Sequence, residues 1–189
     1  MWYTDDLIPI TLDDVDDAAK RCNAWRVFLH WTAGHYGQAY EDYHINIDQD
    51  GSLYCIGDLD FDEKKNHTWK QNSGAIGIAM CCAYGATTDG EDVNFGDEPP
   101  TQEQIDAMAM CMAVLAKNGI MIDNMRTHYE QAILDGYGVP VYTWQQGIYQ
   151  GDPDCRWDLM LLPDSAQNNK LINGGDCLRG KARWFMQHI

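Results

Sequence analysis

Residues 26–37 read RVFLHWTAGHYG and join a short apolar run to two histidines. Valine and aromatic residues in the first six positions favour a β-strand. His30 stands near the end of that strand, and His35 stands in the glycine-containing segment after it. A histidine at a strand end is either a structural residue or a candidate metal ligand. We therefore ask which other strands and polar side chains lie around His30.

Two further segments extend this strand into a sheet. Residues 44–56, HINIDQDGSLYCI, predict two strands around a turn at Asp50 and Gly51. Residues 74–83, GAIGIAMCCA, form an unbroken apolar run of strand length. Such a run indicates an interior strand that is covered on both faces. The first half of the chain is therefore expected to form the centre of a sheet.

Capping residues and apolar spacing predict helices. Thr11 is a candidate cap for an amphipathic helix over residues 11–22, with acidic residues in its first turn. Thr101 and Gln104 form the pattern of a capping box, and the helix after them ends at residues 117–119, KNG. Its apolar residues recur at helical spacing, so we interpret its methionines as core. These positions are Ile105, Met108, Ala109, Met112, Leu115 and Ala116.

The second half of the chain is less regular. Residues 119–138, GIMIDNMRTHYEQAILDGYG, predict a short strand, a loop that carries His128, and a helical stretch that ends at Gly136. A long polar and aromatic loop follows at residues 139–155. The tail from residue 174 is expected to form a final helix that Trp184 and Phe185 dock onto the domain.

Together these elements predict an α/β fold with a central mixed β-sheet flanked by helices. The length of 189 residues fits one domain. We expect residues 1–189 to form it, with residues 163–189 as a C-terminal extension packed on it.

Composition excludes several classes of protein. A formal net charge of -16 repels phosphate backbones, so a nucleic-acid partner is not expected. No apolar stretch approaches the ~20 residues that span a bilayer, and residues 1–10 lack the pattern of a signal peptide. We expect synthesis in the cytoplasm and no membrane insertion. The seven cysteines contain no CxxC pair, so neither a disulfide framework nor a cysteine-only zinc site is expected.

The candidate metal ligands are dispersed along the chain. The HExxH, GxSxG, GxxxxGK[ST] and GxGxxG motifs are all absent. His30 and His128 follow predicted strands, and Asp158 lies in the sequence CRWDL. Strand ends that meet at one sheet edge can supply the three protein ligands of a catalytic zinc ion. Their spacing alone leaves this possibility and a purely structural role for the histidines open.

Four segments, in this order, resemble the type 2 N-acetylmuramoyl-L-alanine amidases, which include phage lysozyme-amidases and peptidoglycan recognition proteins. VFLHWTAG resembles the strand that carries the family's first zinc histidine, and YHINIDQDGSLY resembles its YHFxIxxDGxxY hairpin. NHTWKQNSGAIGIAM is similar to xHAxxxNxxSIGIxL, and MRTHYEQA to the segment with the second zinc histidine. The resemblance spans about Val27 to Leu162 and implies the fold of peptidoglycan recognition proteins.

The resemblance implies a set of zinc ligands. His30 and His128 correspond to the two histidines. Asp158 corresponds to the third ligand because Arg156, two residues before it, matches a donor found there in the family. Cys155 is the alternative, but Pro153 two residues before it has no side-chain donor. The Pro-Gly that usually follows the third ligand is absent, and the local sequence is RWDL.

The resemblance also implies residues that assist the reaction. Tyr43 matches a tyrosine near the metal-bound water, whereas the glutamate that some relatives use is Ala79 here. His67 matches a histidine that lines the substrate cleft. The structural alternatives are a packed hairpin tyrosine and an exposed loop histidine. His35, His44 and His188 match no ligand position, and His44 should face the opposite side of its strand from Tyr43.

The activity that the resemblance implies is hydrolysis of the amide between the lactyl group of N-acetylmuramic acid and L-alanine in peptidoglycan. Zn²⁺ would be the cofactor, Arg156 or His67 would stabilise the oxyanion, and Tyr43 would orient the water or relay its proton. Trp144 and the tyrosines of the long loop would line a groove for the substrate or pack the loop down. These tyrosines are Tyr137, Tyr142 and Tyr149.

A phage endolysin or related lytic effector that acts in the periplasm fits these features, and a monomer is the simplest expectation. Two alternatives stay open at this stage. One is a non-catalytic peptidoglycan-binding domain of the same fold. The other is a zinc peptidase that cuts within the stem peptide.

Overall fold

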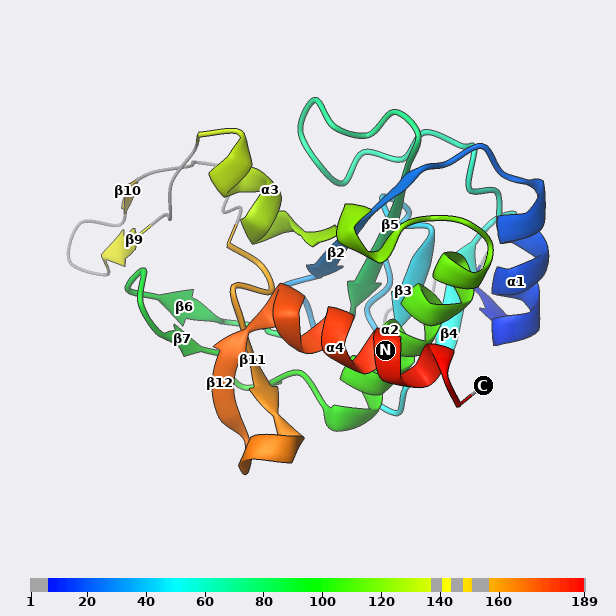
Figure 1. Cartoon of the computed structure of the whole chain (residues 1–189). Helices are drawn as coiled ribbons and strands as arrows, with labels where there is room; N and C mark the ends of the chain where they lie inside the picture. The colour runs from blue at the N-terminus through cyan, green and yellow to red at the C-terminus, as the bar shows by residue number, and fades with distance from the viewer. Residues whose placement is uncertain (1–6, 137–140, 144–147, 151–156, 189) are drawn as a thin grey trace.

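The computed structural model describes residues 7–136, 141–143, 148–150 and 157–188 (Figure 1). A six-stranded mixed sheet runs through its centre in the order β1-β4-β3-β5-β2-β8. The three strands β5, β2 and β8 run parallel, as do β3 and β5, whereas β4 is antiparallel to both β3 and β1. The bounds are β1 Leu7–Ile10, β2 Arg26–Trp31, β3 Ile45–Ile47, β4 Leu53–Ile56, β5 Ala75–Met80 and β8 Met125–Thr127.

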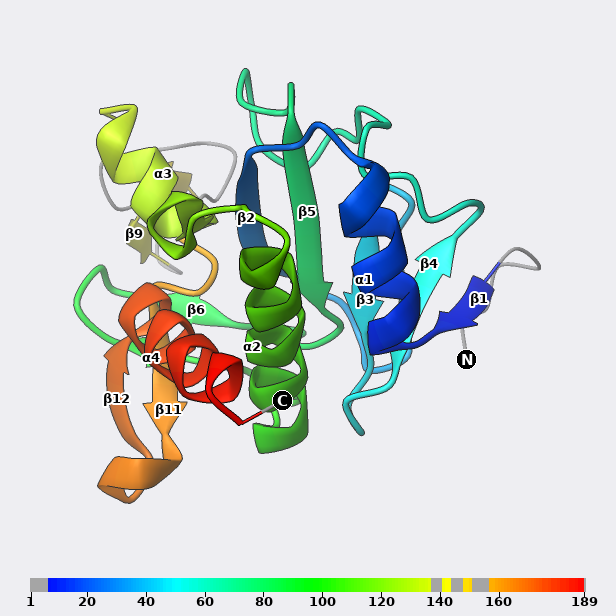
Figure 2. The ribbon, with the colours of Figure 1, turned by 45° about the vertical axis from the view of Figure 1, so that its right-hand side comes forward.

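Helices and small hairpins surround this sheet. Figure 2 shows α1 and α2 side by side in front of the sheet, with α4 beside α2. The helices are α1 Leu12–Arg21, α2 Gln102–Lys117, α3 His128–Leu134 and α4 Gly174–Met186, with 3-10 turns η1 Ile122–Asn124 and η2 Ser165–Gln167. The two-stranded hairpins pair β6 Thr87–Thr88 with β7 Val93–Asn94, β9 Val141–Thr143 with β10 Ile148–Gln150, and β11 Leu161–Asp164 with β12 Lys170–Asn173.

This arrangement confirms the predicted α/β fold with a mixed central sheet. The expected interior strand is β5, in which all six residues are buried. The predicted hairpin is β3 and β4. None of the helices in the described residues has the length and apolar content needed to cross a bilayer. The described cysteines are unpaired.

Capping boxes set where the helices begin. Thr11 caps α1 together with Asp14, and Thr101 caps α2 together with Gln104, as the sequence predicts for both threonines. The buried amide of Gln104 also donates to the carbonyls of Ile47 and Cys81. It therefore joins the start of α2 to the carboxyl ends of β3 and β5.

The two central strands use their two faces differently. On β2, Val27 and Leu29 belong to the main hydrophobic core, whereas Phe28 and His30 point to the opposite face. On β5, the large residues at positions 76, 78 and 80 face the core, and the small residues at 75, 77 and 79 face the other side. The side that carries His30 is therefore lined by small residues on the neighbouring strand.

Two local predictions were wrong. His128 does not lie in a loop: it is the first residue of α3, which begins directly after β8 because Thr127 caps it with Glu130. The predicted docking of the final helix holds for Phe185, which packs against the core, and is wrong for Trp184, which is 55% exposed. The fully buried residues of α4 are Cys177, Leu178 and Ala182, together with the glycines that open the helix.

Candidate metal centre

Parallel pairing of β2 and β8 brings the two histidines together. Leu29 lies opposite Thr127 in the register, and the residues that follow these two in the chain are His30 and His128. Because β2 and β8 are parallel, both histidines lie at the same edge of the sheet. The ring centroids of the two histidines are 4.7 Å apart. Neighbouring strands thus place the two imidazoles side by side although 97 residues separate them in the chain.

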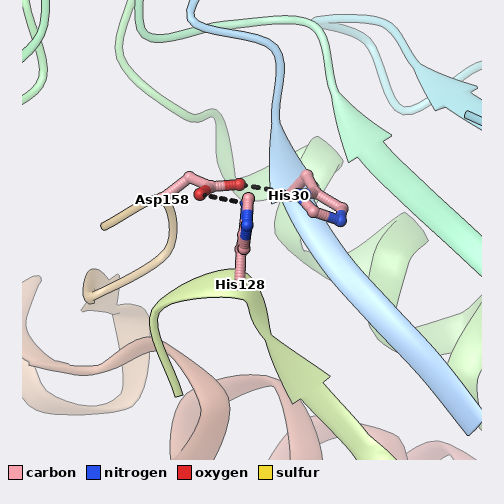
Figure 3. Close-up of side chains that lie close together, drawn as sticks. All are labelled: His30, His128 and Asp158. Atoms are coloured by element: carbon pink, nitrogen blue, oxygen red, sulfur yellow. Dashed lines mark hydrogen bonds and ion pairs between the residues drawn. The ribbon is translucent and has the colours of Figure 1, made fainter. Parts of the chain in front are cut away.

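Asp158 completes a three-residue cluster with these histidines. It lies in the turn before β11, and Figure 3 shows its carboxylate pointing toward both rings. One carboxylate oxygen is 2.8 Å from Nδ1 of His30, and the other is 2.9 Å from Nδ1 of His128. His30 is 1% exposed and Asp158 is 6% exposed. The cluster therefore sits below the surface, with one ligand atom of each residue within 4.8 Å of the others.

The charges of this cluster are set by burial and by mutual contact. Burial alone would raise the pKa of Asp158, but the charges and hydrogen bonds of His128 and His30 outweigh it and hold that pKa below its usual value. Burial lowers the pKa of His30, and the nearby Asp158 opposes this only in part. Near neutral pH the cluster therefore contains a carboxylate and a neutral His30.

This donor set fits a metal ion such as zinc. An ionised carboxylate only accepts hydrogen bonds, so each histidine donates to Asp158 from Nδ1 in the metal-free protein. A cation in place of these protons would meet two imidazole nitrogens and one carboxylate, a set known from catalytic zinc sites. The buried Nε2 of His128 has no hydrogen-bond partner among the described residues.

Thr68 connects His30 to His67. Its hydroxyl is 3.3 Å from Nε2 of His30 and 3.0 Å from Nδ1 of His67, and Thr68 is buried. Because Nε2 of His30 is an acceptor in the metal-free protein, Thr68 donates to His30 and accepts from His67. With a metal at Nδ1 of His30, the His30 proton would lie on Nε2 and the direction of this chain would reverse. Proton positions on His67 are therefore coupled to the metal site.

Gly77 makes room for His67. A Cβ atom at Gly77 would lie 2.5 Å from Cδ2 of the His67 ring, closer than atoms can approach. Burial, together with the nearby His30, His44 and His128, lowers the pKa of His67 well below its usual value of 6.5. His67 is thus a buried neutral imidazole packed flat against β5, not an exposed loop residue.

A cavity of about 490 Å³ opens over the cluster. Tyr43, His67, Thr68, Trp69, His128 and Asp158 are among its lining residues. The ring of Tyr43 lies 5.1 Å from that of His30, and burial together with the charges of Asp158 and Asp42 raises the Tyr43 pKa. Tyr43 therefore keeps its proton at neutral pH and presents a hydroxyl group beside the cluster.

The remaining histidines have other partners. His35 contacts Glu98 through Nδ1 at 2.8 Å and stacks on Tyr84. His44 bonds the backbone through both ring nitrogens, to the carbonyl of Glu63 and the amide of Gly77. Neither of them lines the cavity over the cluster.

Several residues named from the sequence cannot be placed. Arg156, Trp144, Cys155 and Tyr137 lie outside the described residues. Sequence reasoning missed Thr68, although it stands next to His67 in the quoted NHTWKQN segment. A polar residue adjacent to a buried histidine was the available signal.

Much of the chain is similar to a known protein family. A family model described as N-acetylmuramoyl-L-alanine amidase matches residues 18–140, more than half of the chain. The matched residues include His30, Tyr43, His67 and His128, whereas Asp158 lies after them. No curated protein sequence matches the chain.

Replacing Thr68 by valine tests the coupling of His30 to His67. Thr68→Val keeps the shape of the side chain but removes the hydroxyl that both imidazoles contact. We expect the affinity for Zn²⁺ to fall roughly 10- to 100-fold, as for other groups that orient metal-binding histidines. Competition with a chromophoric chelator measures this, and Thr68→Ser, which keeps the hydroxyl, is the control. Wild-type affinity in Thr68→Val would contradict the coupling.

Burial of neutral histidines also predicts how stability depends on pH. Below pH 6.5 the unfolded chain binds protons at His30, His44 and His67 that the folded protein does not, because burial lowers the pKa of all three in the folded state. The free energy of unfolding should therefore decrease as the pH is lowered, by about 1 kcal/mol per histidine per pH unit below 6.5. Asp158 keeps its contribution at these pH values because its own pKa is lowered.

Urea unfolding of chelator-treated protein at pH 7.5, 6.5 and 5.5 measures this slope. His67→Gln removes one of the three titrating imidazoles and should make the dependence shallower. Stability that stays constant down to pH 5.5 would show that these imidazoles are not buried in their neutral form.

Proposed function

The chain belongs to the N-acetylmuramoyl-L-alanine amidase family, and on this premise we propose that it is a zinc-dependent hydrolase of peptidoglycan. The bond cleaved is the amide between the lactyl group of N-acetylmuramic acid and the L-alanine of the stem peptide. The observation that carries the proposal is the cluster of His30, His128 and Asp158, of which His128 and Asp158 line a cavity. The family match includes His30 and His128, and the structure adds Asp158 to them.

In this proposal His30, His128 and Asp158 hold the zinc ion. When bound, zinc polarises an amide carbonyl and lowers the pKa of a water molecule to about 7. The carboxylate of Asp158 supplies the negative charge that balances part of the ion's charge. The two histidines are suited to the task because burial keeps His30 neutral and leaves both Nδ1 atoms directed toward Asp158.

Tyr43 and His67 are the proposed assisting residues. Tyr43 keeps its proton because its pKa is raised, so it acts as a hydrogen-bond donor that orients the water or the carbonyl rather than as a base. His67, packed beside His30, lines the substrate cavity and contacts the substrate. Arg156 is proposed to stabilise the negative charge that develops on the carbonyl oxygen. Ala79 on β5 carries no carboxylate, so it supplies no general base.

The proposed substrate is a sugar-peptide strand of the cell wall. The cavity is open to solvent above the cluster, and Trp69 at its wall is 58% exposed. An exposed indole offers a flat apolar surface for a sugar ring, and we assign Trp144 of the long loop a similar role. A lytic role, as in a phage endolysin or related effector acting in the periplasm, is part of the proposal.

Digestion of purified peptidoglycan followed by mass spectrometry tests the reaction. The amidase should release intact stem peptides that begin with L-alanine, and metal removal by a chelator should abolish the release until Zn²⁺ is restored. Asp158→Ala should reduce activity to background and lose stoichiometric zinc, because the site is left with two neutral ligands. Cys155→Ser should retain both.

Other outcomes identify the alternatives. Fragments that leave amino acids on the muramic acid would indicate a peptidase. Binding of peptidoglycan without any cleavage by the zinc-loaded protein would indicate a non-catalytic domain. Zinc lost in Cys155→Ser but kept in Asp158→Ala would show that Cys155 is the third ligand.

A further inference from the structure

The first two turns of α4 contact both chain segments that carry the clustered ligands. Helix α4 begins at Gly174, beyond residues 18–140 that match the family model. One contact reaches the turn that follows Asp158, and the other reaches Glu130, two residues after His128. Both contacts therefore come from the C-terminal segment that follows the matched residues.

The contact beside Asp158 depends on a glycine. A Cβ atom at Gly174 would lie 2.1 Å from the carbonyl oxygen of Leu159, so only glycine fits there. Gly174 also donates its amide to the carbonyl of Met160 at 3.1 Å. Leu159 has a positive φ of 59°, which a leucine adopts only when its surroundings impose it. The start of α4 therefore fixes the backbone immediately after Asp158.

The contact beside His128 involves a partly buried ion pair. Arg179 donates to both carboxylate oxygens of Glu130, at 2.8 and 2.7 Å, and also to the carbonyl of Met125. Glu130 in turn accepts from the amide of Thr127 at 3.0 Å, which closes the capping box at the start of α3. Because His128 is the first residue of α3, this capping box fixes the position of the His128 backbone.

A second glycine makes room for that ion pair. A Cβ atom at Gly175 would lie 2.2 Å from a carboxylate oxygen of Glu130. Gly175 and Arg179 are four residues apart, so they occupy the same face of α4. The side chains of Arg179 and Glu130 are 14% and 18% exposed, whereas those of Arg183, also on α4, and its partner Asp123 in η1 are 54% and 86% exposed.

We propose that Gly174, Gly175 and Arg179 form a positioning clamp that sets the separation of His128 from Asp158. The proposal rests on the metal site argued above. In the clamp, Gly174 holds the backbone after Asp158, while Gly175 and Arg179 hold Glu130 and with it the start of α3. A direct link between the two segments, from the amide of Tyr129 to the carbonyl of Asp158 at 3.3 Å, joins the parts that the clamp holds.

The clamp has a specific energetic requirement. A partly buried guanidinium and carboxylate lose part of their hydration, so such a pair favours one geometry only when its hydrogen bonds are complete. The carboxylate of Glu130 receives donors from Arg179 and from Thr127, which meets this requirement. A shift of Glu130 would break these bonds and move His128 with it.

Metal binding by four full-length variants tests the clamp. Gly175→Ala inserts a methyl group against Glu130, and its control Gly180→Ala adds one on the same helix where nothing lies within 4 Å. Arg179→Met breaks the ion pair with Glu130, and its control Arg183→Met breaks the exposed ion pair with Asp123. We expect the Zn²⁺ affinity to fall roughly ten-fold or more in Gly175→Ala and Arg179→Met and to change less than about two-fold in the controls.

A spectroscopic signal separates positioning from general loss of folding. Co²⁺ bound in place of Zn²⁺ absorbs visible light according to its coordination geometry, so Gly175→Ala and Arg179→Met should change the band while far-ultraviolet circular dichroism stays native. Arg179→Lys keeps the charge without the two-pronged contact and should give an intermediate Zn²⁺ affinity.

A double-mutant cycle identifies the contact responsible. In the Glu130→Ala background the clash partner of residue 175 is gone, so adding Gly175→Ala should weaken Zn²⁺ binding no further. An undiminished effect of Gly175→Ala in that background, or wild-type affinity and spectrum in both clamp variants, would overturn the clamp alone. Failure of the wild-type protein to bind Zn²⁺ or Co²⁺ would overturn the metal site as well.

Discussion

A buried carboxylate between the buried imidazole of His30 and the partly buried imidazole of His128 is the constraint on which the rest of the structure depends. An isolated charge below the surface costs several kcal/mol, and Asp158 is tolerated there because His30 and His128 donate to its two oxygens. The three residues come from a strand, a helix start and a turn. The sheet register, the capping of α3 and the turn before β11 must therefore all agree for the cluster to form.

The division of the sheet into two faces turns this constraint into a site. Large residues on one face of β2 and β5 fill the core under the helices, and the small residues of β5 on the other face leave room for a second layer of imidazole and hydroxyl groups. His67 and Thr68 occupy that layer and connect the cluster to the open cavity. In the proposed hydrolase, the hydrogen bonds of this layer would couple the protonation of His30 to that of His67, which lines the substrate cavity.

Local patterns were sufficient to predict the elements, whereas the contacts between distant elements were not. The turn at Asp50 and Gly51, the unbroken apolar run at residues 74–83 and the helical spacing of apolar residues correctly predicted β3, β4, β5, α1 and α2, because each pattern lies within a short window. His30, His128 and Asp158 were selected by resemblance to a family, and the structure brings these three together. The register of β2 with β8 brings His30 and His128 together, but the sequence of neither strand predicts that register.

The misses have two different origins. Thr127 was not identified as a helix cap although Thr127 and Glu130 form the same local capping-box pattern as Thr101 and Gln104, so this miss was not caused by a distant contact. The docking of α4 was assigned to Trp184 and Phe185, and Phe185 does pack against the core, but Trp184 remains exposed and Gly174 and Gly175 make the close approaches. Glycines chosen for contact with a distant backbone carry no local pattern that distinguishes them from glycines in ordinary turns.

The most direct measurement is X-ray diffraction from zinc-loaded crystals, recorded on both sides of the zinc absorption edge. The account predicts one anomalous peak about 2.0–2.2 Å from Nδ1 of His30, Nδ1 of His128 and a carboxylate oxygen of Asp158. The absence of a peak among these three side chains, or a peak bonded to the sulfur of Cys155 in place of Asp158, would contradict it.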